Sequence, residues 1–419
     1  MATSSGSSTT AGAGDGAARG SGSGSLSSLR EFNRLRIVDF LRTNGTASRA
    51  ELARRTGLSR STVSTLVADL QRRGLVVERD GEFAGEGQPG RPAVLLELDP
   101  SAAAAVGVDF DHDKVRVAVS DLSRSVLAED SAPHDVDHDA QGALDLAAKL
   151  VESVLAKTDL ERHRLLGTGI ALAGPIDHDL GTLHPSDVLP SWSGVDVAKE
   201  MENRLRTPIY VDNDANLGAL AEVTLGAGRN ARFATFVSVS SGIGAGIIVD
   251  GRPYRGHRGT AGEIGHFVVD PQGPICRCGN RGCLETLASG PALLRLVEAS
   301  RDEQLTVKQM IELARQGDAG CRRAIADAGQ VVGAVVAGLV NLFSPEMVVI
   351  GGDVGEAGEL LLDPLREAVR RDALPAAAAE LKVVAGELGE RANLLGALAL
   401  VLMQSEHAVA ARVAGSAAA

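Results

Sequence analysis

The sequence contains few aromatic residues and no long apolar run. Aromatic side chains make up 3% of the 419 residues, whereas hydrophobic residues together make up 44%, which is ample for large buried cores. The sequence has neither a run of about 18 apolar residues nor a basic segment followed by an apolar one, so we expect no membrane span and no secretion signal. At this length we expect roughly two to three domains.

Cysteine is also scarce, and its placement argues against disulfide bonds. Of the four cysteines, Cys321 lies alone in a helical pattern, as a buried thiol would, and the other three lie within one short loop. Nothing in this pattern implies a disulfide framework. We therefore expect the cytoplasm as the compartment.

An excess of positive charge is missing as well. The formal net charge is -12, which taken alone argues against a protein that binds nucleic acid. The charge is distributed unevenly, however, because residues 26–98 contain 12 Arg and 9 acidic residues, a net +3. Residues from 99 onward contain 29 basic and 44 acidic residues, a net -15. The sequence therefore predicts a mildly basic module joined to an acidic body.

The loop over residues 262–285 holds most of the metal-binding side chains. Four of them have the right chemistry for zinc: His266, Cys276, Cys278 and Cys283. One imidazole and three thiolates would fill the roughly four tetrahedral positions of zinc and leave none for a catalytic water. Three reduced cysteines and a surface histidine are the alternative, but Gly279 and Gly282 permit the tight turns that bring the last cysteine back to a metal. The pattern favours a structural zinc site.

Glu263 and Glu285 lie on either side of this group without belonging to it. Carboxylates beside a zinc-ordered loop are well placed to accept hydrogen bonds from neutral hydroxyls, which suggests a polyol ligand. The motifs Gly-Glu-x-Gly-His and Cys-x-Cys-Gly-x-x-Gly-Cys-x-Glu resemble the signature of the ROK family, which groups bacterial sugar kinases with sugar-responsive repressors. The resemblance implies that His266 binds zinc through one ring nitrogen while the other faces a sugar hydroxyl, with both glutamates completing the polar wall.

The N-terminal region is predicted to contain a leader followed by three helices. Residues 1–25 are nearly all Ser, Gly, Ala and Thr, which cannot bury enough apolar surface to offset the entropy of ordering, so we expect a disordered leader. Apolar residues recur with helical spacing over residues 28–42. Ser48 then begins a second helix with a capping box, this helix stops at Gly57, and Ser59 caps a third helix.

The third helix has one apolar and one polar face. Its inward stripe consists of Val63, Leu66, Val67 and Leu70. Its opposite face carries Arg60, Ser61, Thr62, Ser64 and Thr65. Two short helices that meet at a glycine turn, with hydroxyls and an arginine at the start of the second, match a helix-turn-helix whose recognition helix enters the major groove of DNA. A helical hairpin with a solvated polar face is the alternative.

A predicted wing favours DNA binding over the simple hairpin. Residues 75–79 and 93–98 are predicted to form two strands around a Gly-rich tip over residues 81–92. Arg91, within Gly-Arg-Pro, would be an extended cationic finger suited to a narrow minor groove. The whole module, residues 26–98, resembles the winged DNA-binding domain of ROK repressors.

A second domain begins after residue 99, with strands predicted over residues 105–110 and 115–121. In ROK and related sugar kinases the turn between these strands reads Asp-x-Gly-Gly-Thr-Lys, and its backbone amides and Thr hydroxyl receive the ATP phosphates. This chain reads Asp-Phe-Asp-His-Asp-Lys over residues 109–114, so two carboxylates replace a glycine and the threonine. Like charges at that range would cost several kcal/mol at an effective dielectric constant of about 20. We therefore expect no ATP-dependent catalysis.

Two further loops complete the implied sugar pocket. Gly174, in Ala-Gly-Pro, resembles the family loop that places an amide near the sugar. Asn213 and Asp214 follow a strand whose carboxyl end lies over the usual crevice of α/β sheets. The resemblance implies that Asn213 hydrogen-bonds the sugar, and that Asp214, the general base of the kinases, keeps only the binding half of its role. Trp192, in a segment that resembles the family's pocket cap, either lines the pocket or lies at the edge of the core.

Two Gly-rich turns carry less information. Residues 240–246 resemble the second phosphate loop of the kinases, and residues 348–353 resemble the strand and turn near the adenosine. Tight connections between strands and helices need glycine for geometry alone. We interpret both turns as retained architecture.

The expected fold is a winged helix-turn-helix followed by a two-lobed α/β sugar kinase fold of the actin-like, ribonuclease H-like kind. We expect lobe 1 over residues 99–222, lobe 2 with the zinc loop over residues 223–390, a helix over about 391–405 that returns to lobe 1, and a tail over residues 406–419.

The expected function is a sugar-responsive DNA-binding transcriptional regulator of the repressor type, with a non-catalytic kinase domain as its sensor. Its partners would be a double-stranded DNA operator, a small sugar or sugar phosphate, and copies of itself in a homodimer or homotetramer. A sugar kinase with an accessory DNA-binding domain is the main alternative. A ligand-insensitive DNA-binding scaffold is another, but it would lack some of the pocket residues, all of which are present.

Overall fold

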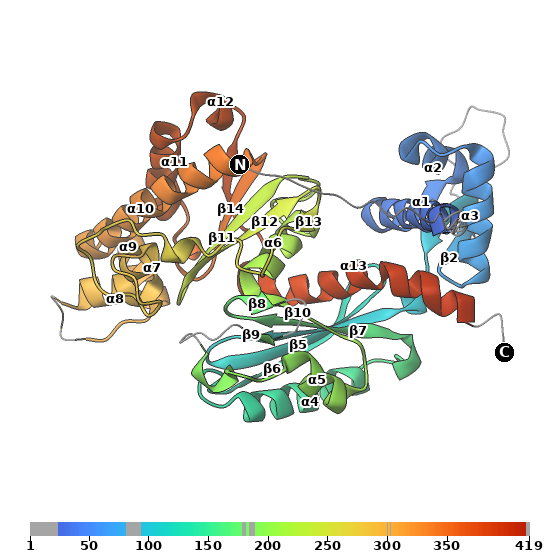
Figure 1. Cartoon of the computed structure of the whole chain (residues 1–419), viewed down its shortest axis with the longest axis horizontal. Helices are drawn as coiled ribbons and strands as arrows, with labels where there is room; N and C mark the ends of the chain where they lie inside the picture. Colours follow the sequence, from blue (N-terminus) through green and yellow to red (C-terminus); the bar gives the residue numbers. More distant parts are fainter. Residues whose placement is uncertain are drawn as a thin grey trace, which may run out of the picture. The chain divides into compact units, whose positions relative to one another are not determined.

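A computed structural model gives the fold of the chain (Figure 1). The structure describes residues 24–80, 94–177, 182–183, 189–299, 301 and 303–415. The chain divides into two compact units, Met1–Leu98 and Asp99–Ala419. The predicted wing tip with Arg91 and most of the predicted leader lie outside the described residues, although the first helix begins at Gly24, just inside that leader.

The first unit contains three helices and a small antiparallel sheet. Its elements are α1 (Gly24–Asn44), β1 (Ala47–Ser48), α2 (Arg49–Thr56), α3 (Arg60–Arg72), β2 (Val76–Asp80) and β3 (Val94–Leu98), with strand order β1-β3-β2. Both predicted N-cap residues are confirmed, because Ser48 Oγ accepts from the amide of Glu51 at 3.2 Å and Ser59 Oγ from that of Thr62 at 3.1 Å; this bond is the half of the capping box predicted at Ser48 that the structure shows. Gly57 ends α2 in the left-handed conformation with φ 68°.

The core of this unit lies under α3. The predicted inward stripe is buried: Val63, Leu66, Val67 and Leu70. A buried carboxylate, Asp69, joins α1 to α3 because it pairs with Arg34 at 2.6 Å and with Arg73 at 2.9 Å. Arg72 adds a third contact at 3.0 Å. Hydrophobic burial and this ion cluster together fix the orientation of α3, the predicted recognition helix.

Lobe 1 of the second unit is built on a mixed sheet. Its elements are β4 (Ala104–Phe110), β5 (Lys114–Asp121), β6 (Val126–Pro133), α4 (Ala140–Ala156), β7 (Leu165–Leu172), β8 (Ile176–Asp177), β9 (Thr182–Leu183), α5 (Val197–Leu205), β10 (Ile209–Asn213) and α6 (Asp214–Thr224). The sheet order is β10-β7-β4-β5-β6, with β10, β7 and β4 parallel. α4 and α5 cover one face of the sheet (Figure 1).

Lobe 2 contains a second sheet covered by helices. Its elements are β11 (Ala234–Val239), β12 (Ile243–Val249), β13 (Arg252–Pro253), α7 (Leu284–Ala288), α8 (Gly290–Glu298), α9 (Val307–Arg315), α10 (Ala319–Phe343), β14 (Met347–Gly351), α11 (Glu359–Asp372), α12 (Pro375–Ala378) and β15 (Lys382–Ala385). The strand order is β13-β12-β11-β14-β15. A capping box begins α9, with Thr306 and Gln309 bonded to each other's backbone amides.

α10 is the one helix of the described chain that is long and apolar enough to cross a membrane. It packs instead against α11 within the core of lobe 2. A side chain at Gly329 or Gly333 would approach the carbonyl oxygens of Leu361 and Leu365 to 2.4 and 2.5 Å, so the two helices touch through their backbones. The apolar surface of α10 therefore belongs to the core of the lobe.

The last helix, α13 (Ala392–Gly415), returns to lobe 1, as the sequence predicts. It lies on the face of the sheet opposite α4 and α5 (Figure 1). A Cβ atom at Gly169 of β7 would lie 2.0 Å from the carbonyl oxygen of Ala397, which shows how closely helix and sheet approach. A Cβ atom at Gly246 of β12 would lie 2.2 Å from the carbonyl oxygen of Ala215. α6 therefore packs between α13 and the sheet of lobe 2.

The strand register brings three turns to one edge of the lobe 1 sheet. Phe110 at the end of β4 pairs with Leu172 of β7, which pairs in turn with Asn213 of β10. The turns that follow these strands begin with Asp111, the Ala-Gly-Pro segment that contains Gly174, and Asp214. Because the strands are parallel, all three turns lie at the same edge of the sheet.

Trp192 belongs to the core. Its side chain is fully buried, its indole N–H donates to the carbonyl oxygen of Val136 at 2.7 Å, and its ring meets Phe110 edge to face with centroids 5.0 Å apart. Of the two alternatives that the sequence leaves open, the structure supports a core position over a pocket-lining one.

Candidate functional site

The structure brings the four predicted metal-binding side chains together. The ligand atoms of His266, Cys276, Cys278 and Cys283 all lie within 4.8 Å of one another. His266 Nδ1 lies 3.6 Å from the sulfur of Cys276, and the sulfurs of Cys278 and Cys283 are also 3.6 Å apart. Zinc–sulfur bonds of about 2.3 Å in a tetrahedron place two sulfurs about 3.8 Å apart. The donor set and its spacing therefore fit a four-coordinate zinc ion.

The backbone conformation and hydrogen bonds of this loop give it its compact shape. Gly279 and Gly282 have φ values of 89° and 63°, as their predicted role in tight turns requires. The amide of Cys276 donates to the carbonyl oxygen of Asn280 at 2.7 Å. A Cβ atom at Gly282 would lie 1.5 Å from the carbonyl oxygen of Asp270, so only glycine fits there.

His266 links the metal-binding group to the carboxylate wall. Its Nδ1 atom faces the cysteine sulfurs, while its Nε2 atom lies 3.9 Å from Glu263. Burial raises the pKa of Glu263 to about 7, and the nearby charges of Asp214 and Glu285 add to the shift. Three carboxylates thus lie close enough for their charges to interact.

Glu285 is held by an arginine that the sequence analysis does not single out. Arg277 lies between two of the cysteines, and its Nη2 atom is 2.8 Å from Glu285 Oε1. The amide of Ile243 donates to the other carboxylate oxygen at 3.4 Å. A Cβ atom at Gly242 would lie 2.8 Å from Glu285, so the turn between β11 and β12 packs against this ion pair.

Asn213 joins two loops of the site. Its Nδ2 atom donates to the carbonyl oxygen of Gly174 at 3.0 Å, and its Oδ1 atom accepts from the amide of Asn216 at 3.2 Å, which caps α6. Gly174 has φ 97°, a conformation that favours glycine. One amide hydrogen and one lone pair of Asn213 remain for a ligand.

The carboxylate before Asn213 is structural. Asp212 is fully buried, and Arg255 binds its Oδ2 atom through Nε at 2.8 Å and Nη2 at 2.5 Å. Asn216 Nδ2 donates to its other oxygen at 3.0 Å. This arrangement fixes the position of the end of β10 and of the start of α6, where Asn213 and Asp214 lie.

Asp214 lies at the first position of α6. Its Oδ1 atom accepts from the amide of Ala215 at 2.8 Å. Burial and the charge of Asp111 together raise the pKa of Asp214 to about 6, against the opposing effects of the Ala215 amide and His112. A carboxylate with this pKa is ionised at neutral pH and can accept a hydrogen bond from a ligand hydroxyl.

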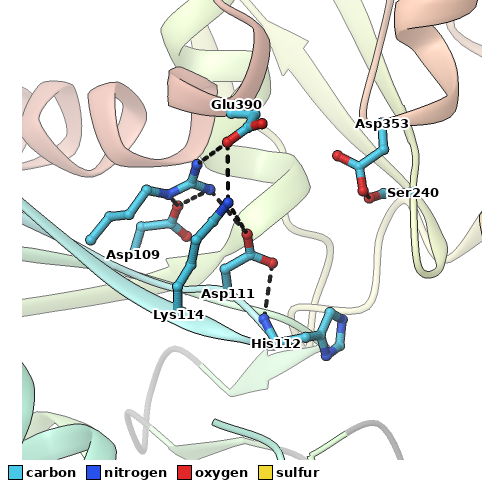
Figure 2. A network of polar contacts seen from close by, with 8 residues as sticks. Asp109, Asp111, His112, Lys114, Ser240, Asp353 and Glu390 are labelled. Carbon is cyan, nitrogen blue, oxygen red and sulfur yellow. Dashed lines mark hydrogen bonds and ion pairs between the residues drawn. The ribbon is translucent and has the colours of Figure 1, made fainter. Parts of the chain in front are cut away.

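An ion-pair network fills the turn that corresponds to the first phosphate loop. Arg116 of β5 binds Asp109 at 2.8 Å and Asp111 at 3.2 Å, and it lies 3.3 Å from Glu390. Lys114 Nζ lies 3.1 Å from the same Glu390 oxygen. Figure 2 shows Asp109, Asp111 and Lys114 converging below Glu390.

Glu390 belongs to a short 3-10 helix, Gly389–Arg391, that leads from lobe 2 into α13. The network therefore joins the β4–β5 turn to the segment where the chain crosses between lobes. Arg391, its neighbour, pairs with Glu129 of β6 at 2.6 Å. Desolvation raises the pKa of Asp109 to about 7, and Arg116 works against that shift.

The remaining residues of this turn face other partners. The ring of His112 extends away from the network in Figure 2, and its Nδ1 atom lies 2.7 Å from Asp137. On the other side of the view, Ser240 donates to Asp353 at 2.8 Å, which joins the two Gly-rich turns of lobe 2. Asp113 is exposed.

In the first unit, the polar face of α3 is largely exposed. The hydroxyls of Ser64 and Thr65 donate to carbonyl oxygens of their own helix at 2.9 and 3.0 Å, so their lone pairs remain available outward. A shallow pocket on this face is lined by Asn33, Ser61, Thr62, Thr65 and Leu66. Asn33 of α1 thus joins the predicted DNA-binding residues on one surface.

Sequence reasoning missed several residues of these sites. Arg116 had a detectable signal, because an arginine within the apolar strand Val-Arg-Val must find a buried partner. Asn33, Arg277 and Glu390 had none. Glu390 lies 276 residues from Lys114, and its approach depends on the path of the whole second unit.

Together, the two-lobed kinase-like body, the metal-binding loop and the helix-turn-helix define the class: a transcriptional regulator built on a sugar kinase scaffold. Residues 105–404 match the model of the ROK family, and the chain belongs to that family. Residues 31–82 match the model of the MarR family of DNA-binding domains.

Similar proteins support the same class. The chain is 33% identical to the xylose repressor of Caldicellulosiruptor bescii over 387 residues, which cover 89% of this chain and 96% of that one. The crystal structure of a ROK family transcriptional regulator, a homologue of the Escherichia coli MLC protein, matches with TM-score 0.78 and 25% identity over 92% of this chain and 99% of that one. A ROK family glucokinase from Streptomyces griseus, in complex with glucose and AMPPNP, matches 71% of this chain and 99% of its own at TM-score 0.64 and 30% identity. The chain is therefore a DNA-binding transcriptional regulator of the repressor type, with the kinase-like domain as its sensor.

Proposed function

We propose that the chain represses transcription by binding an operator as a homodimer or homotetramer, and that a small sugar in the second unit changes its affinity for DNA. Residues 26–98 would bind DNA, and residues 99–222 and 223–390 would form the two lobes of the sensor. We propose that the protein acts in the cytoplasm.

The observation that carries this proposal is the ion-pair network at the β4–β5 turn. In a kinase this turn must present backbone amides to the ATP phosphates. Here Asp111 takes the place of a glycine, and Arg116 and Lys114 are already bound to carboxylates. Because a triphosphate would meet fixed negative charge, we propose that the sensor binds sugar without phosphorylating it.

We propose zinc as the metal held by His266, Cys276, Cys278 and Cys283. With four protein ligands the ion would be structural and would order the loop that carries Glu263 and Glu285. The fit of the donor atoms supports this assignment. A bound ion would also fix the ring of His266, whose Nε2 atom could then meet a ligand hydroxyl.

The proposed sugar site combines hydrogen-bonding groups from both lobes. Its members are Gly174, Asn213, Asp214, Glu263, His266 and Glu285. The carboxylates would accept hydrogen bonds from sugar hydroxyls, while the remaining amide hydrogen of Asn213 would donate one. Because the groups come from different lobes, a sugar that contacts all of them would favour a closed arrangement of the lobes.

The proposed DNA contacts are on the exposed face of α3. Arg60, Ser61, Thr62, Ser64 and Thr65 would read base edges in the major groove, and Arg91 of the wing would enter the minor groove. One small winged module makes few phosphate contacts, so two or more copies would be needed for tight binding.

The proposal as a whole can be tested with the full-length protein. Fluorescence anisotropy on operator DNA, with and without a panel of hexoses, pentoses and 2-acetamido sugars, should show a shift in the DNA dissociation constant for one of them. A coupled ATPase assay with the same sugars should stay at background. Sugar-dependent ATP turnover would instead establish the kinase alternative.

The DNA face has its own test. Arg60→Ala should weaken binding to operator DNA by about 1–3 kcal/mol but reduce binding to random DNA much less, because a base contact carries the discrimination. Arg323→Ala, which removes an exposed arginine of the second unit, is the charge-matched control. Equal losses on operator and random DNA for Arg60→Ala would count against the assignment.

A further inference from the structure

The distance from Asp111 to Asp214 follows from the sheet. Asp111 follows β4 and Asp214 follows Asn213 of β10, and only β7 lies between these strands. Strands in a sheet are about 4.8 Å apart, so the two residues begin their turns about 10 Å from each other. A hydroxyl held by Asp214 would therefore lie on the order of 10 Å from the turn that carries Asp111.

Asp111 is fixed in place by three contacts. Its Oδ1 atom accepts from the amide of His112 at 2.9 Å, and its Oδ2 atom lies 3.2 Å from Arg116 and 3.8 Å from Lys114. The side chain is still 34% exposed. The carboxylate is thus neither mobile nor covered, and its charge acts on the neighbouring space. The raised pKa of Asp214, to which the charge of Asp111 contributes, agrees with this closeness.

Negative charge is in excess on this side of the site. Its carboxylates are Asp109, Asp111, Glu390, Asp214, Glu263 and Glu285. The cations paired with one or more of those carboxylates are Lys114, Arg116 and Arg277, and the charges of Lys308 and His112 also act on Glu390 and Asp214. A phosphate could recruit Lys114 only by displacing Glu390, which lies 3.1 Å from it.

We propose that the effector is an unphosphorylated sugar, and that Asp111 excludes sugars that carry a phosphate on the hydroxyl next to Asp214. A phosphate monoester carries between one and two negative charges at neutral pH. Placed on that hydroxyl, it would lie between two fixed carboxylates. This inference rests on the proposed function, because it concerns the ligand of the same site.

Sugar pairs that differ only in a phosphate test the proposal. The full-length protein is titrated with D-glucose and glucose 6-phosphate, and with N-acetyl-D-glucosamine and its 6-phosphate; D-xylose is added without a phosphate partner, because a 5-phosphate prevents its six-membered ring from closing. DNA affinity and thermal unfolding are the readouts. The sugar that acts should do so at a concentration on the order of 100-fold lower than its phosphate.

A variant then assigns the discrimination to one residue. Asp111→Asn keeps the size of the side chain and removes its charge, so the ratio of effective concentrations should fall about tenfold. Asp159→Asn removes a charge from an exposed side chain between α4 and β7, at the opposite edge of the sheet, and should leave the ratio unchanged. A ratio within one protein preparation is insensitive to partial loss of folded protein, so a destabilised variant still gives an answer.

The outcomes separate this inference from the proposed function. A sugar phosphate that acts at the same or a lower concentration than its free sugar would overturn the inference while the sensor function stands. An unchanged ratio in Asp111→Asn would remove the role of Asp111. If no compound of either kind changes DNA affinity or thermal unfolding, the proposed sugar-sensing function itself fails, and the inference with it.

Discussion

The β4–β5 turn and the loop over residues 262–285 belong to the same site but differ in what they can still do. The loop holds four side chains that could bind a metal, together with both glutamates, in a compact arrangement. The turn instead has Asp111 and His112 in place of glycines, and its cations are paired within the protein. Under the proposed function, one side of the site would bind hydroxyls, whereas the other would exclude phosphates.

This difference indicates that the presence of one candidate catalytic residue does not identify an enzyme. Asp214 has the position and the pKa of about 6 that a general base would need. Catalysis of phosphoryl transfer depends mainly on positioning and charge stabilisation of the phosphates. If the turn does not receive them, as we propose, the same aspartate is left with hydrogen bonding alone. Function is therefore inferred from the whole site.

The largest effect is expected on the loop side, from Cys278→Ser. Loss of one of four ligands should remove the metal, disorder the loop that carries Glu263 and Glu285, and abolish the sugar response. Elemental analysis should give about one zinc per chain in the parent and near none in the variant. DNA binding by the separate N-terminal unit should persist.

Cys321→Ser is the control for this experiment. Cys321 is also buried, but it lies in α10 beside Arg301 and outside the metal-binding group. Its replacement should leave the zinc content and the sugar response unchanged. If the parent protein contains no zinc, the comparison between the loop and the turn fails, because the loop would then be ordered by its glycine turns alone.

On the turn side, Arg116→Ala should lower the free energy of unfolding by about 3–5 kcal/mol, because it leaves the buried carboxylate of Asp109 without its partner. Lys114→Ala, which removes a cation from the same network, should cost no more than about 1 kcal/mol. The reason is exposure, since the Lys114 side chain is 31% exposed and the Arg116 side chain 9%.

Chemical denaturation at pH 7.5 measures both variants. Asp109→Asn introduced together with Arg116→Ala should recover part of the loss, because the unpaired charge is then removed. Equal losses in the two single variants would show that the network stabilises the turn as a diffuse charge cluster. The turn would then be a weaker barrier to phosphate than its geometry indicates.

The sequence predicts the loop side better than the turn side, for physical reasons. The four metal ligands and their glycines lie within one short stretch, so local spacing is enough to place them together. The fold class, the capped helices and the returning α13 also follow from local patterns and from the family resemblance. The departure from the kinases' phosphate-binding turn is visible in the sequence at Asp111 and His112. The ion-pair network that occupies the turn is not visible there. Glu390 reaches Lys114 from 276 residues away, which no local pattern encodes.

Arg277 illustrates a second limit. Its position between two cysteines is plain in the sequence, yet its contact with Glu285 depends on the direction in which the loop turns. Trp192 shows the reverse case, in which the sequence leaves two alternatives. The hydrogen bond to Val136 and the contact with Phe110 decide between them.

The smallest expected effect, a pH dependence, sharpens the comparison at Asp214. The pKa of this carboxyl is raised from 3.8 to about 6, so the folded protein holds the proton more tightly than the unfolded chain does. The stability that this group contributes is therefore fully present below pH 4 and is lost as the pH rises through about 6.

Sugar binding should change in the opposite direction, because only the ionised carboxylate accepts hydrogen bonds through both oxygens. The sugar dissociation constant should fall about tenfold between pH 5 and 7.5, as the ionised fraction of a group with pKa 6 rises from about a tenth to nearly complete. Asp214→Asn should bind more weakly and show a flatter profile, because the group with pKa about 6 is removed. Asp113→Asn should keep the parent's profile.

A sugar affinity that is the same at pH 5 and 7.5, or an Asp214→Asn variant that responds at the parent's sugar concentration, would remove Asp214 from the sensor. The turn and the loop would then have to be compared around a different residue.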